Sequence, residues 1–252
     1  LADFYSIDGQ QLTPDDFGET VNGYWKSKDY AGSYGTNGFH LTFKDDVVSE
    51  GFNTVTWRGT GASNSVSGIG FSPAFVWIKD RTDATVNYLT DVVRGADKEI
   101  YSCGGTDGNS DTALAEYTDT NTLTTFDADG FTVGTSTGTN GSADNMVAWC
   151  WEASTSFSND TSATGVGNVD SEGKTNTAKG FSIIKWVYST SADQTIAHGL
   201  DSAPTFIIVK SRTTAYNFDV YHSGLSAATK RLILNHNSAE QNGFFDTAPT
   251  ST

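Results

Sequence analysis

Carboxylates and histidines are the side chains of this 252-residue sequence that could carry out acid–base chemistry. Two carboxylates at a suitable distance can cleave glycosidic bonds, and the 30 acidic residues supply pairs such as Asp80/Asp83 and Asp127/Asp129. Because 30 acidic residues produce many such pairs by chance, these two pairs carry little weight. His222-Ser223 lies on an expected strand, where neighbours point to opposite faces, and the sequence contains no Gly-x-Ser-x-Gly motif. We predict no catalytic residue and a non-enzymatic protein.

Two loops rich in Asp and Asn offer the oxygen ligands that Ca²⁺ prefers. They are residues 107–111, Asp-Gly-Asn-Ser-Asp, and residues 127–130, Asp-Ala-Asp-Gly. Neither matches a twelve-residue calcium loop with a terminal Glu, and the turn-forming tendency of these residues explains both equally well. Calcium is an open alternative, and no other metal or cofactor is expected.

The sequence has two cysteines, and their spacing does not suit a zinc site. Cys150 lies in the apolar run 147–151, Val-Ala-Trp-Cys-Trp, and is predicted to be a small buried hydrophobe. Cys103 lies in a predicted loop. Two cysteines do not make a disulfide scaffold in a chain of this length, although a bridge between them stays open as an alternative.

Aromatic residues in a polar N-terminal stretch are candidates for ligand or protein contact, because exposed rings suit sugar stacking and interfaces. The favoured alternative is that this stretch wraps over the following module and buries the rings. The candidates are Tyr24, Trp25, Tyr30 and Tyr34.

Basic residues recur at two equivalent strand ends in an otherwise acidic chain. They could pair with carboxylates of an adjoining subunit, or they could be solvated strand ends. These residues are Lys79, Arg81, Lys210 and Arg212.

The elements that position these residues are predicted to be β-strands throughout. Twenty-six Gly residues and abundant Thr disfavour long helices, whereas Val, Ile, Thr and the 6 Trp, 10 Tyr and 15 Phe suit half-buried strands. The fold class is therefore all-β. The expected strands are residues 52–57, 75–79, 86–93, 98–101, 130–133, 146–151, 181–188, 206–210, 218–221 and 231–235.

An internal repeat organises the chain. Residues 71–81 recur as residues 202–212, with Phe75 matching Phe206 and Lys79 matching Lys210, and residues 51–57 recur as 180–186. A gapped match that keeps apolar, aromatic and basic positions in one order indicates a duplicated structural unit. We therefore predict two related β-sandwich-like modules.

The predicted organisation has four parts. Residues 1–50 form an extended N-terminal arm with short strands and a hairpin at Asn22-Gly23. Residues 51–152 form module one, residues 153–179 a polar linker, and residues 180–252 a shorter or incomplete module two. Module two has no counterpart of strands 130–133 and 146–151, so its sheet would expose apolar edges. We expect residues 230–252 to pair with a neighbouring chain or with the arm.

Charge limits the partners of the protein. The formal charge is −15, with 15 basic and 30 acidic residues. Nucleic acid and anionic membranes both require clustered Lys and Arg, so neither is an expected partner. The sequence also contains no run of about 18 apolar residues.

Several ordered motifs together carry a family resemblance. They are residues 7–19 (Ile-Asp-Gly-Gln-Gln-Leu-Thr-Pro-Asp-Asp-Phe-Gly-Glu), 30–39 (Tyr-Ala-Gly-Ser-Tyr-Gly-Thr-Asn-Gly-Phe), 70–79 (Gly-Phe-Ser-Pro-Ala-Phe-Val-Trp-Ile-Lys), 92–96 (Val-Val-Arg-Gly-Ala), 124–134 (Thr-Thr-Phe-Asp-Ala-Asp-Gly-Phe-Thr-Val-Gly), 147–151, 198–200 (His-Gly-Leu) and 220–222 (Val-Tyr-His). This arrangement resembles the repeat modules of large virion structural proteins of tailed bacteriophages, especially marine and cyanobacterial phages.

The resemblance implies a tail-fibre or surface-appendage subunit that acts in assembly or host adhesion. It implies a virion or extracellular location, contacts with other virion proteins and with host surface glycans, and, by analogy with fibres, a homotrimer. The family offers no catalytic residues to carry over. The alternatives are a carbohydrate-binding module and a polysaccharide depolymerase of a tailspike.

Overall fold

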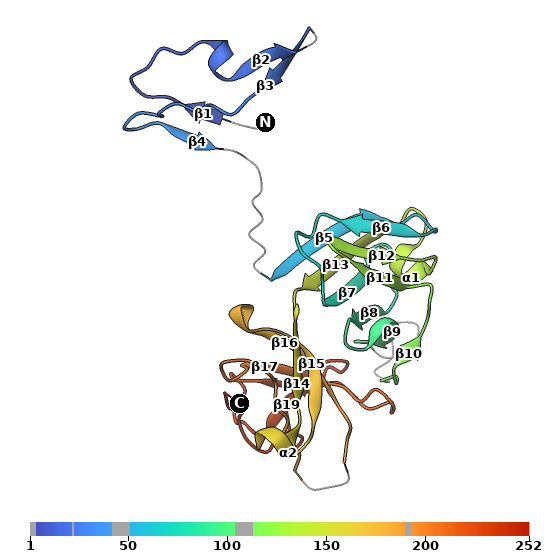
Figure 1. Cartoon of the computed structure of the whole chain (residues 1–252). Helices are drawn as coiled ribbons and strands as arrows, with labels where there is room; N and C mark the ends of the chain where they lie inside the picture. Colours follow the sequence, from blue (N-terminus) through green and yellow to red (C-terminus); the bar gives the residue numbers. More distant parts are fainter. Residues whose placement is uncertain (1–3, 22, 42–50, 104–112, 190–192, 252) are drawn as a thin grey trace. The chain divides into compact units, whose positions relative to one another are not determined.

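The computed structural model describes residues 4–21, 23–41, 51–103, 113–189 and 193–251 (Figure 1). The chain is built almost entirely of antiparallel β-sheets, as predicted. It divides into a small N-terminal unit, residues 1–48, and a large second unit, residues 49–252. Every predicted strand is present, with ends shifted by up to three residues.

The N-terminal unit contains two small two-stranded sheets. β1 (Phe4–Ser6) pairs with β4 (Phe39–Leu41), and β2 (Gly18–Val21) pairs with β3 (Tyr24–Ser27). The β2–β3 turn confirms the predicted hairpin. Gly23 lies in this turn with a φ of +84°, a conformation that favours glycine.

A six-stranded antiparallel sheet is the centre of module one, with strand order β10-β9-β8-β7-β13-β5. β13 hydrogen-bonds to both β5 and β7, and a strand inside a sheet that is covered on both faces carries apolar residues on both its own faces, as β13 does. The strands are β5 (Phe52–Arg58), β7 (Phe75–Asp80), β8 (Asn87–Asp91), β9 (Gly95–Tyr101), β10 (Tyr117–Thr118) and β13 (Asn145–Trp151).

A three-stranded sheet covers one face of the six-stranded sheet. It consists of β6 (Asn64–Ser67), β12 (Gly130–Val133) and β11 (Leu123–Asp127), and α1 (Thr137–Asn140) follows β12. Alternate side chains of β7 and β13 point into the core between these sheets. The buried core residues are Val66, Ile69, Phe71, Val76, Ile78, Leu123, Phe131, Val133, Met146, Ala148 and Cys150. No helix among the described residues is long and apolar enough to cross a membrane.

Residues 153–179 are not a linker, which corrects the prediction. They contain β14 (Thr155–Asn159), α2 (Thr161–Thr164) and β15 (Ser171–Asn176), and β15 pairs with β16 (Phe181–Trp186). The composition was misleading because small polar residues can form strands when neighbours satisfy their backbone groups. The few larger side chains pack closely against the rest of the module. The ring of Phe157, for example, lies so near Gly199 that a Cβ atom at this glycine would be 2.4 Å from it.

The remaining strands of module two form a second sheet, β17-β18-β19-β20. β19 pairs with β18 and β20 of its own chain, so the expectation that residues 230–252 would pair with a neighbour or the arm is wrong for these strands. The four strands are β17 (Phe206–Val209), β18 (Asp219–His222), β19 (Lys230–Ile233) and β20 (Gln241–Asn242).

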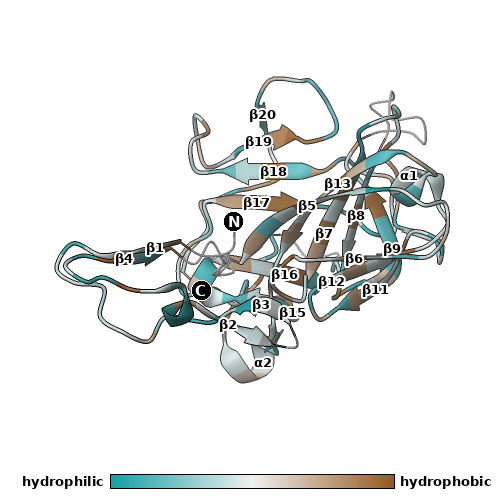
Figure 2. Cartoon of the chain, turned by 90° about the horizontal axis from the view of Figure 1, so that it is seen from above, coloured by the Kyte–Doolittle hydropathy of each residue, from teal (hydrophilic) through white to brown (hydrophobic). Residues whose placement is uncertain are grey.

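A second apolar core joins the two modules. Phe75 and Trp77 point from β7 toward the face opposite to that of Val76 and Ile78, because successive strand residues alternate. They pack with Leu89 and Ile100 of module one and with Phe218 and Leu234 of module two. The six-stranded sheet is thus covered on both faces, and Figure 2 shows the hydrophobic stretches of its strands.

Phe218 is the buried centre of this second core, with a side chain only 2 % exposed. We expect Phe218→Ala to lower the free energy of unfolding by about 3–5 kcal/mol, because a large cavity would separate the modules. Urea unfolding would measure the loss. Tyr216→Ala, at a residue 66 % exposed, is the control and should change stability by less than about 0.5 kcal/mol. Equal effects of the two substitutions would contradict a shared core.

Candidate functional site

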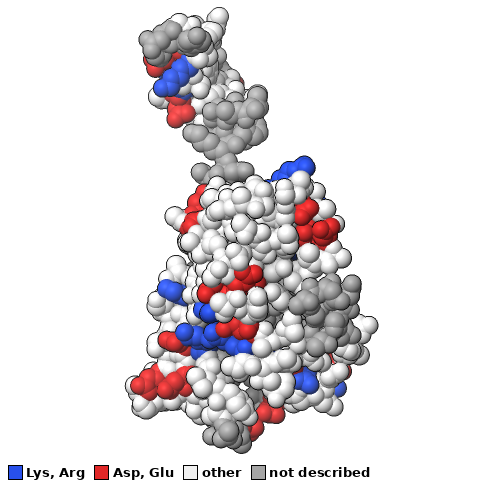
Figure 3. All heavy atoms as spheres, turned by 90° about the vertical axis from the view of Figure 1, so that its right-hand side faces the viewer, with Lys and Arg blue, Asp and Glu red and all other residues white. Residues whose placement is uncertain are grey.

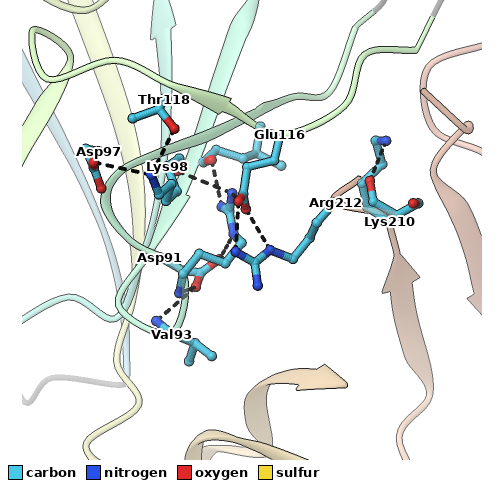
Figure 4. Close-up of polar contacts among 11 residues, drawn as sticks. Asp91, Val93, Asp97, Lys98, Glu116, Thr118, Lys210 and Arg212 are labelled. Carbon is cyan, nitrogen blue, oxygen red and sulfur yellow. Dashed lines mark hydrogen bonds and ion pairs between the residues drawn. The ribbon is translucent and has the colours of Figure 1, made fainter. Parts of the chain in front are cut away.

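A network of ion pairs connects module one to module two (Figure 4). Arg94 follows β8, and its guanidinium pairs with Asp91 and donates to the carbonyl oxygens of Leu89, at 2.8 Å, and Lys98, at 3.3 Å. The Arg94 side chain is only 7 % exposed. Its planar set of donors can satisfy several acceptors at once, which a lysine could not do in the same place.

Glu116 extends this network to module two. Its Oε2 and Oε1 accept hydrogen bonds from Nε and Nη2 of Arg212, both at 2.8 Å, and its backbone N–H donates to the Arg212 carbonyl at 2.8 Å. Burial alone would raise the pKa of Glu116, but hydrogen bonds and charge from Arg212, followed by the charge of Arg94, lower it below its usual value. Arg212 therefore pairs with a carboxylate of its own chain, where the sequence suggested a carboxylate of an adjoining subunit.

The two equivalent lysines also serve their own modules. Lys79 Nζ donates to the carbonyl oxygens of Thr85, at 3.0 Å, and Asp83, at 3.2 Å. Lys210 Nζ donates in the same way to Ser211, at 2.8 Å, and Thr214, at 3.3 Å. Each lysine closes the turn after its strand, which gives its ammonium group a role within its own module.

Lys210 and Arg81 differ in burial. Burial lowers the pKa of Lys210 to about 8, with only a partial offset from the charge of Asp219. Arg81 is exposed, and its proposed role as a subunit contact stays a prediction. On the face shown in Figure 3, Lys and Arg lie among Asp and Glu rather than in one basic field.

Module two has two free strand edges where module one has a strand. In module one, β13 lies between β5 and β7. Their counterparts in the repeat are β16 and β17, and each is the last strand of its own sheet. In Figure 2 the strands follow in the order β18, β17, β16, β15, and β16 and β17 are also neighbours in Figure 1. No strand among the described residues is hydrogen-bonded between them.

Side-chain exposure reflects this difference. Val76 and Ile78 of β7 are 0 % and 1 % exposed, whereas their counterparts on β17 are only half-buried. On the other face of β17, Phe206 is 54 % and Ile208 36 % exposed. Exposed apolar edge strands are sites where another chain can add a strand. The β16 and β17 edges are therefore our main candidate site, and we call them the open edges.

The predicted aromatic site is only partly available. Tyr30 and Tyr34 belong to an aromatic cluster within the N-terminal unit, in which Tyr5 stacks on His40 with ring centroids 3.9 Å apart and Phe17 also packs. This packing makes a ligand-binding role for the two tyrosines less favourable. Trp25 is 53 % exposed and remains a candidate, and the side chain of Tyr24 lies outside the described residues.

The predicted calcium turn at residues 127–130 is held by internal hydrogen bonds. Asp129 accepts from the backbone N–H groups of Gly70, at 2.6 Å, and Gly68, at 3.2 Å. Asp127 accepts from the Thr125 and Thr132 hydroxyls at 2.9 and 2.8 Å. Turn chemistry accounts for these carboxylates, so this calcium site is not supported. The second predicted loop, residues 107–111, lies outside the described residues.

The structure adds a third carboxylate to the pair Asp80/Asp83, which the sequence offered only as a chance pair. Asp80 ends β7, Asp83 lies in the following turn and Asp144 precedes β13. One carboxylate oxygen from each lies within 4.8 Å of the others. No motif contains the three, since Asp144 is distant in sequence. The signal for Asp144 would have been the pairing of β7 with β13, which brings the charged ends of these two strands together.

The cysteines are both free thiols, so the alternative of a bridge between Cys103 and Cys150 is excluded. Cys150 points into the core from β13, and burial raises its pKa to about 12, which makes it unreactive. Cys103 accepts a hydrogen bond from the backbone N–H of Asn87, with the sulfur 3.3 Å from the nitrogen.

Two further features bear on the enzymatic alternative. Glu99 on β9 is completely buried, and burial, followed by the charge of Asp119, raises its pKa to about 8. A neutral acid can donate a proton, but Glu99 has no exposed surface. The hollow of about 400 Å³ beside α2 is lined by one acid, Asp170, which accepts from the backbone N–H and hydroxyl of Thr161. Neither feature offers a pair of accessible carboxylates.

The Glu116–Arg212 pair should be energetically coupled. We expect Glu116→Gln and Arg212→Gln each to lower the free energy of unfolding, with a coupling energy of about 1–3 kcal/mol in a double-mutant cycle, because Glu116 is largely buried. Glu172 and Lys185 form an exposed pair at 3.1 Å and serve as the control, with an expected coupling below about 1 kcal/mol. Similar coupling energies in both pairs would contradict the conclusion that the Glu116–Arg212 pair stabilises the junction of the two modules.

Glu99 should make stability depend on pH. Between its ordinary pKa of 4.5 and about 8, the folded protein keeps a proton that the unfolded chain has released, so stability falls as pH rises. Glu99→Gln removes this dependence. The variant should gain stability relative to the wild type by up to about 1.4 kcal/mol per pH unit across this window, measured by urea unfolding. A constant difference at all pH values would mean that Glu99 is ionised when folded.

The second structural unit matches a known protein family. Residues 48–252 match a family model described as a domain of unknown function, DUF7483. Searches among curated proteins and solved structures found no match. The matched region contains module one, module two and the strands between them, which agrees with a single structural unit. This chain belongs to the DUF7483 family.

Proposed function

We propose that this chain is a non-enzymatic virion structural protein, a tail-fibre or surface-appendage subunit of a tailed bacteriophage that acts in assembly or host adhesion. The resemblance of its ordered motifs supports the phage setting. The observation that carries the assembly role is the pair of open edges on β16 and β17. A sheet that lacks its central strand favours completion by another polypeptide.

Module one shows which kind of strand would fit the open edges of module two. In module one, Trp149 of β13 lies between Thr54 of β5 and Trp77 of β7. The equivalent position in module two lies between Ile183 and Ile208. An incoming strand would run antiparallel to both β16 and β17, and its apolar residues would cover the exposed side chains of β17.

The proposed occupant is an extended segment of a neighbouring virion protein with the apolar pattern of β13, Met-Val-Ala-Trp-Cys-Trp. We favour a different polypeptide because β13 itself is buried in module one and hydrogen-bonded on both sides. The homotrimer expected by analogy with fibres stays a prediction.

The alternatives have weaker support. A carbohydrate-binding module would use exposed aromatics, but Tyr30 and Tyr34 lie in the cluster of the N-terminal unit, which leaves Trp25. A depolymerase would need two carboxylates facing a groove. The acidic side chain at the hollow beside α2 is instead hydrogen-bonded to its own chain.

Strand addition can be tested within one polypeptide. A flexible Gly/Ser linker and a second copy of residues 145–151, with Ala at the cysteine position, would be appended to the chain. We expect the appended strand to stabilise the protein by at least about 2 kcal/mol, a rise in Tm of about 4–8 °C, because it buries apolar side chains and pairs both open edges. Hydrogen exchange should show new protection of β16 and β17.

The matched control is an appended segment with proline at the positions of Val147 and Trp149, where proline cannot donate the required hydrogen bonds. Ile208→Lys in the recipient edge should abolish the gain while changing the stability of the original chain little, since Ile208 is 36 % exposed. The proposed assembly role is wrong if neither Tm nor exchange changes with the intact strand. Loss of a pre-existing homo-oligomer on strand addition would instead assign the open edges to a second copy.

A further inference from the structure

Three carboxylates meet at one end of the central sheet of module one. Asp80 ends β7, Asp83 lies in the following turn and Asp144 directly precedes β13. One oxygen from each lies within 4.8 Å of the other two. This spacing matches oxygens around a single cation, because Ca²⁺–oxygen distances of about 2.3–2.6 Å place ligand oxygens no more than about 5 Å apart.

The buried member of the cluster points to a missing ligand. Asp80 is only 1 % exposed, and its Oδ1 accepts from the backbone N–H groups of Thr82, at 2.7 Å, and Asp83, at 3.1 Å. Its Oδ2 is also buried but has no hydrogen-bond partner among the described residues. A buried carboxylate oxygen without a partner is costly, and a cation would satisfy it.

Module two provides an internal comparison for this turn. Ser211 and Thr214 stand at the positions that Asp80 and Asp83 occupy in module one. The Ser211 hydroxyl accepts from the Thr214 backbone N–H at 3.2 Å, so a neutral side chain is sufficient to hold the same turn. The turn therefore explains Oδ1 of Asp80, but it does not explain Oδ2 or the two further carboxylates.

The backbone fixes the three carboxylates before any ligand binds. The Asn145 N–H donates to the Thr82 hydroxyl at 2.8 Å, and the Arg81 N–H donates to the Asn145 carbonyl at 2.8 Å, so the turn is tied to the start of β13. The Asp144 carbonyl accepts from the Gly59 N–H at 2.8 Å. A site with this fixed geometry loses little conformational entropy on binding.

Like charges dominate the surroundings of the cluster. Partial burial, followed by repulsion from Asp80 and Asp83, raises the pKa of Asp144. None of the ion pairs found in the described part of the chain reaches these three carboxylates. Two basic residues flank Asp80 in the sequence: Arg81 is exposed, and Lys79 Nζ donates to the backbone carbonyls of Thr85 and Asp83 rather than to a carboxylate of the cluster.

We propose that Asp80, Asp83 and Asp144 bind one Ca²⁺ ion. An all-oxygen set selects a hard cation. Ca²⁺ accepts irregular coordination completed by water, whereas Mg²⁺ requires a nearly ideal octahedron and gives up its water reluctantly. Asp83 is exposed, which leaves a route for the ion. The bound ion would tie the end of β7 to the start of β13.

Thermal unfolding of the whole chain, with Ca²⁺ and with a chelator, tests this site. At a Ca²⁺ concentration 100 times the Kd, Tm should rise by about 5–10 °C, and the same concentration of Mg²⁺ should give a smaller rise. Isothermal titration should give one ion per chain. Absence of a Ca²⁺-dependent rise in the wild type would overturn the proposal.

Charge-neutralising variants separate binding from a structural role. Asp144→Asn and Asp83→Asn should each reduce the Ca²⁺-dependent rise in Tm at least several-fold. In the chelator they should unfold at the same temperature as the wild type or higher, because they remove like-charge repulsion. Asp201→Asn, at an exposed acid outside the cluster, is the control and should keep the full rise. A rise retained in Asp144→Asn and Asp83→Asn would mean that Ca²⁺ acts elsewhere on this acidic chain.

Discussion

Backbone hydrogen bonding of a central strand is the constraint on which this structure depends. Each β-strand has two edges of polar groups, and these must be paired or left to water or another chain. In module one, β13 pairs both β5 and β7, and its alternate side chains fill the core. Its neighbour β7 sends Val76 and Ile78 into the same core and, by alternation, Phe75 and Trp77 to the opposite face, where module two packs. β7, paired with β13, thus contributes to both apolar cores.

The two copies of the duplicated unit share their side-chain contacts in the turns and differ in their contacts with other parts of the chain. Lys79 and Lys210 close equivalent turns through backbone carbonyls. The two arginines that follow them have diverged: Arg81 is exposed, whereas Arg212 reaches Glu116 of the other module. A duplicated position can therefore keep its residue type while its environment changes. Burial of Glu116 makes the second arrangement costly to break, because the loss of either partner leaves a charge without compensation.

Periodicity in the sequence was sufficient to predict the fold class and the strands with large alternating side chains. It failed for β14 and β15, where Ser, Thr and Asn form strands whose partners, rather than their own side chains, stabilise them. The site was less accessible to prediction. Arg212 has the same basic character as Arg81, so its intramolecular partner could not be inferred without knowing that Glu116 lies opposite. The approach of Asp144 to Asp80 likewise depends on the pairing of two strands that are far apart in the chain.

The acidic cluster and the central strand depend on each other. Asp144 has its place only because β13 enters the sheet beside β7, with Met146 opposite Asp80. In the described part of module two, no strand occupies the corresponding position, and the residues at the turn, Ser211 and Thr214, are neutral. Two carboxylates in that turn would repel each other without a third ligand to complete a cation site. The neutral turn of module two is therefore the arrangement that physical chemistry favours when the central strand of a sheet is not supplied by the same module.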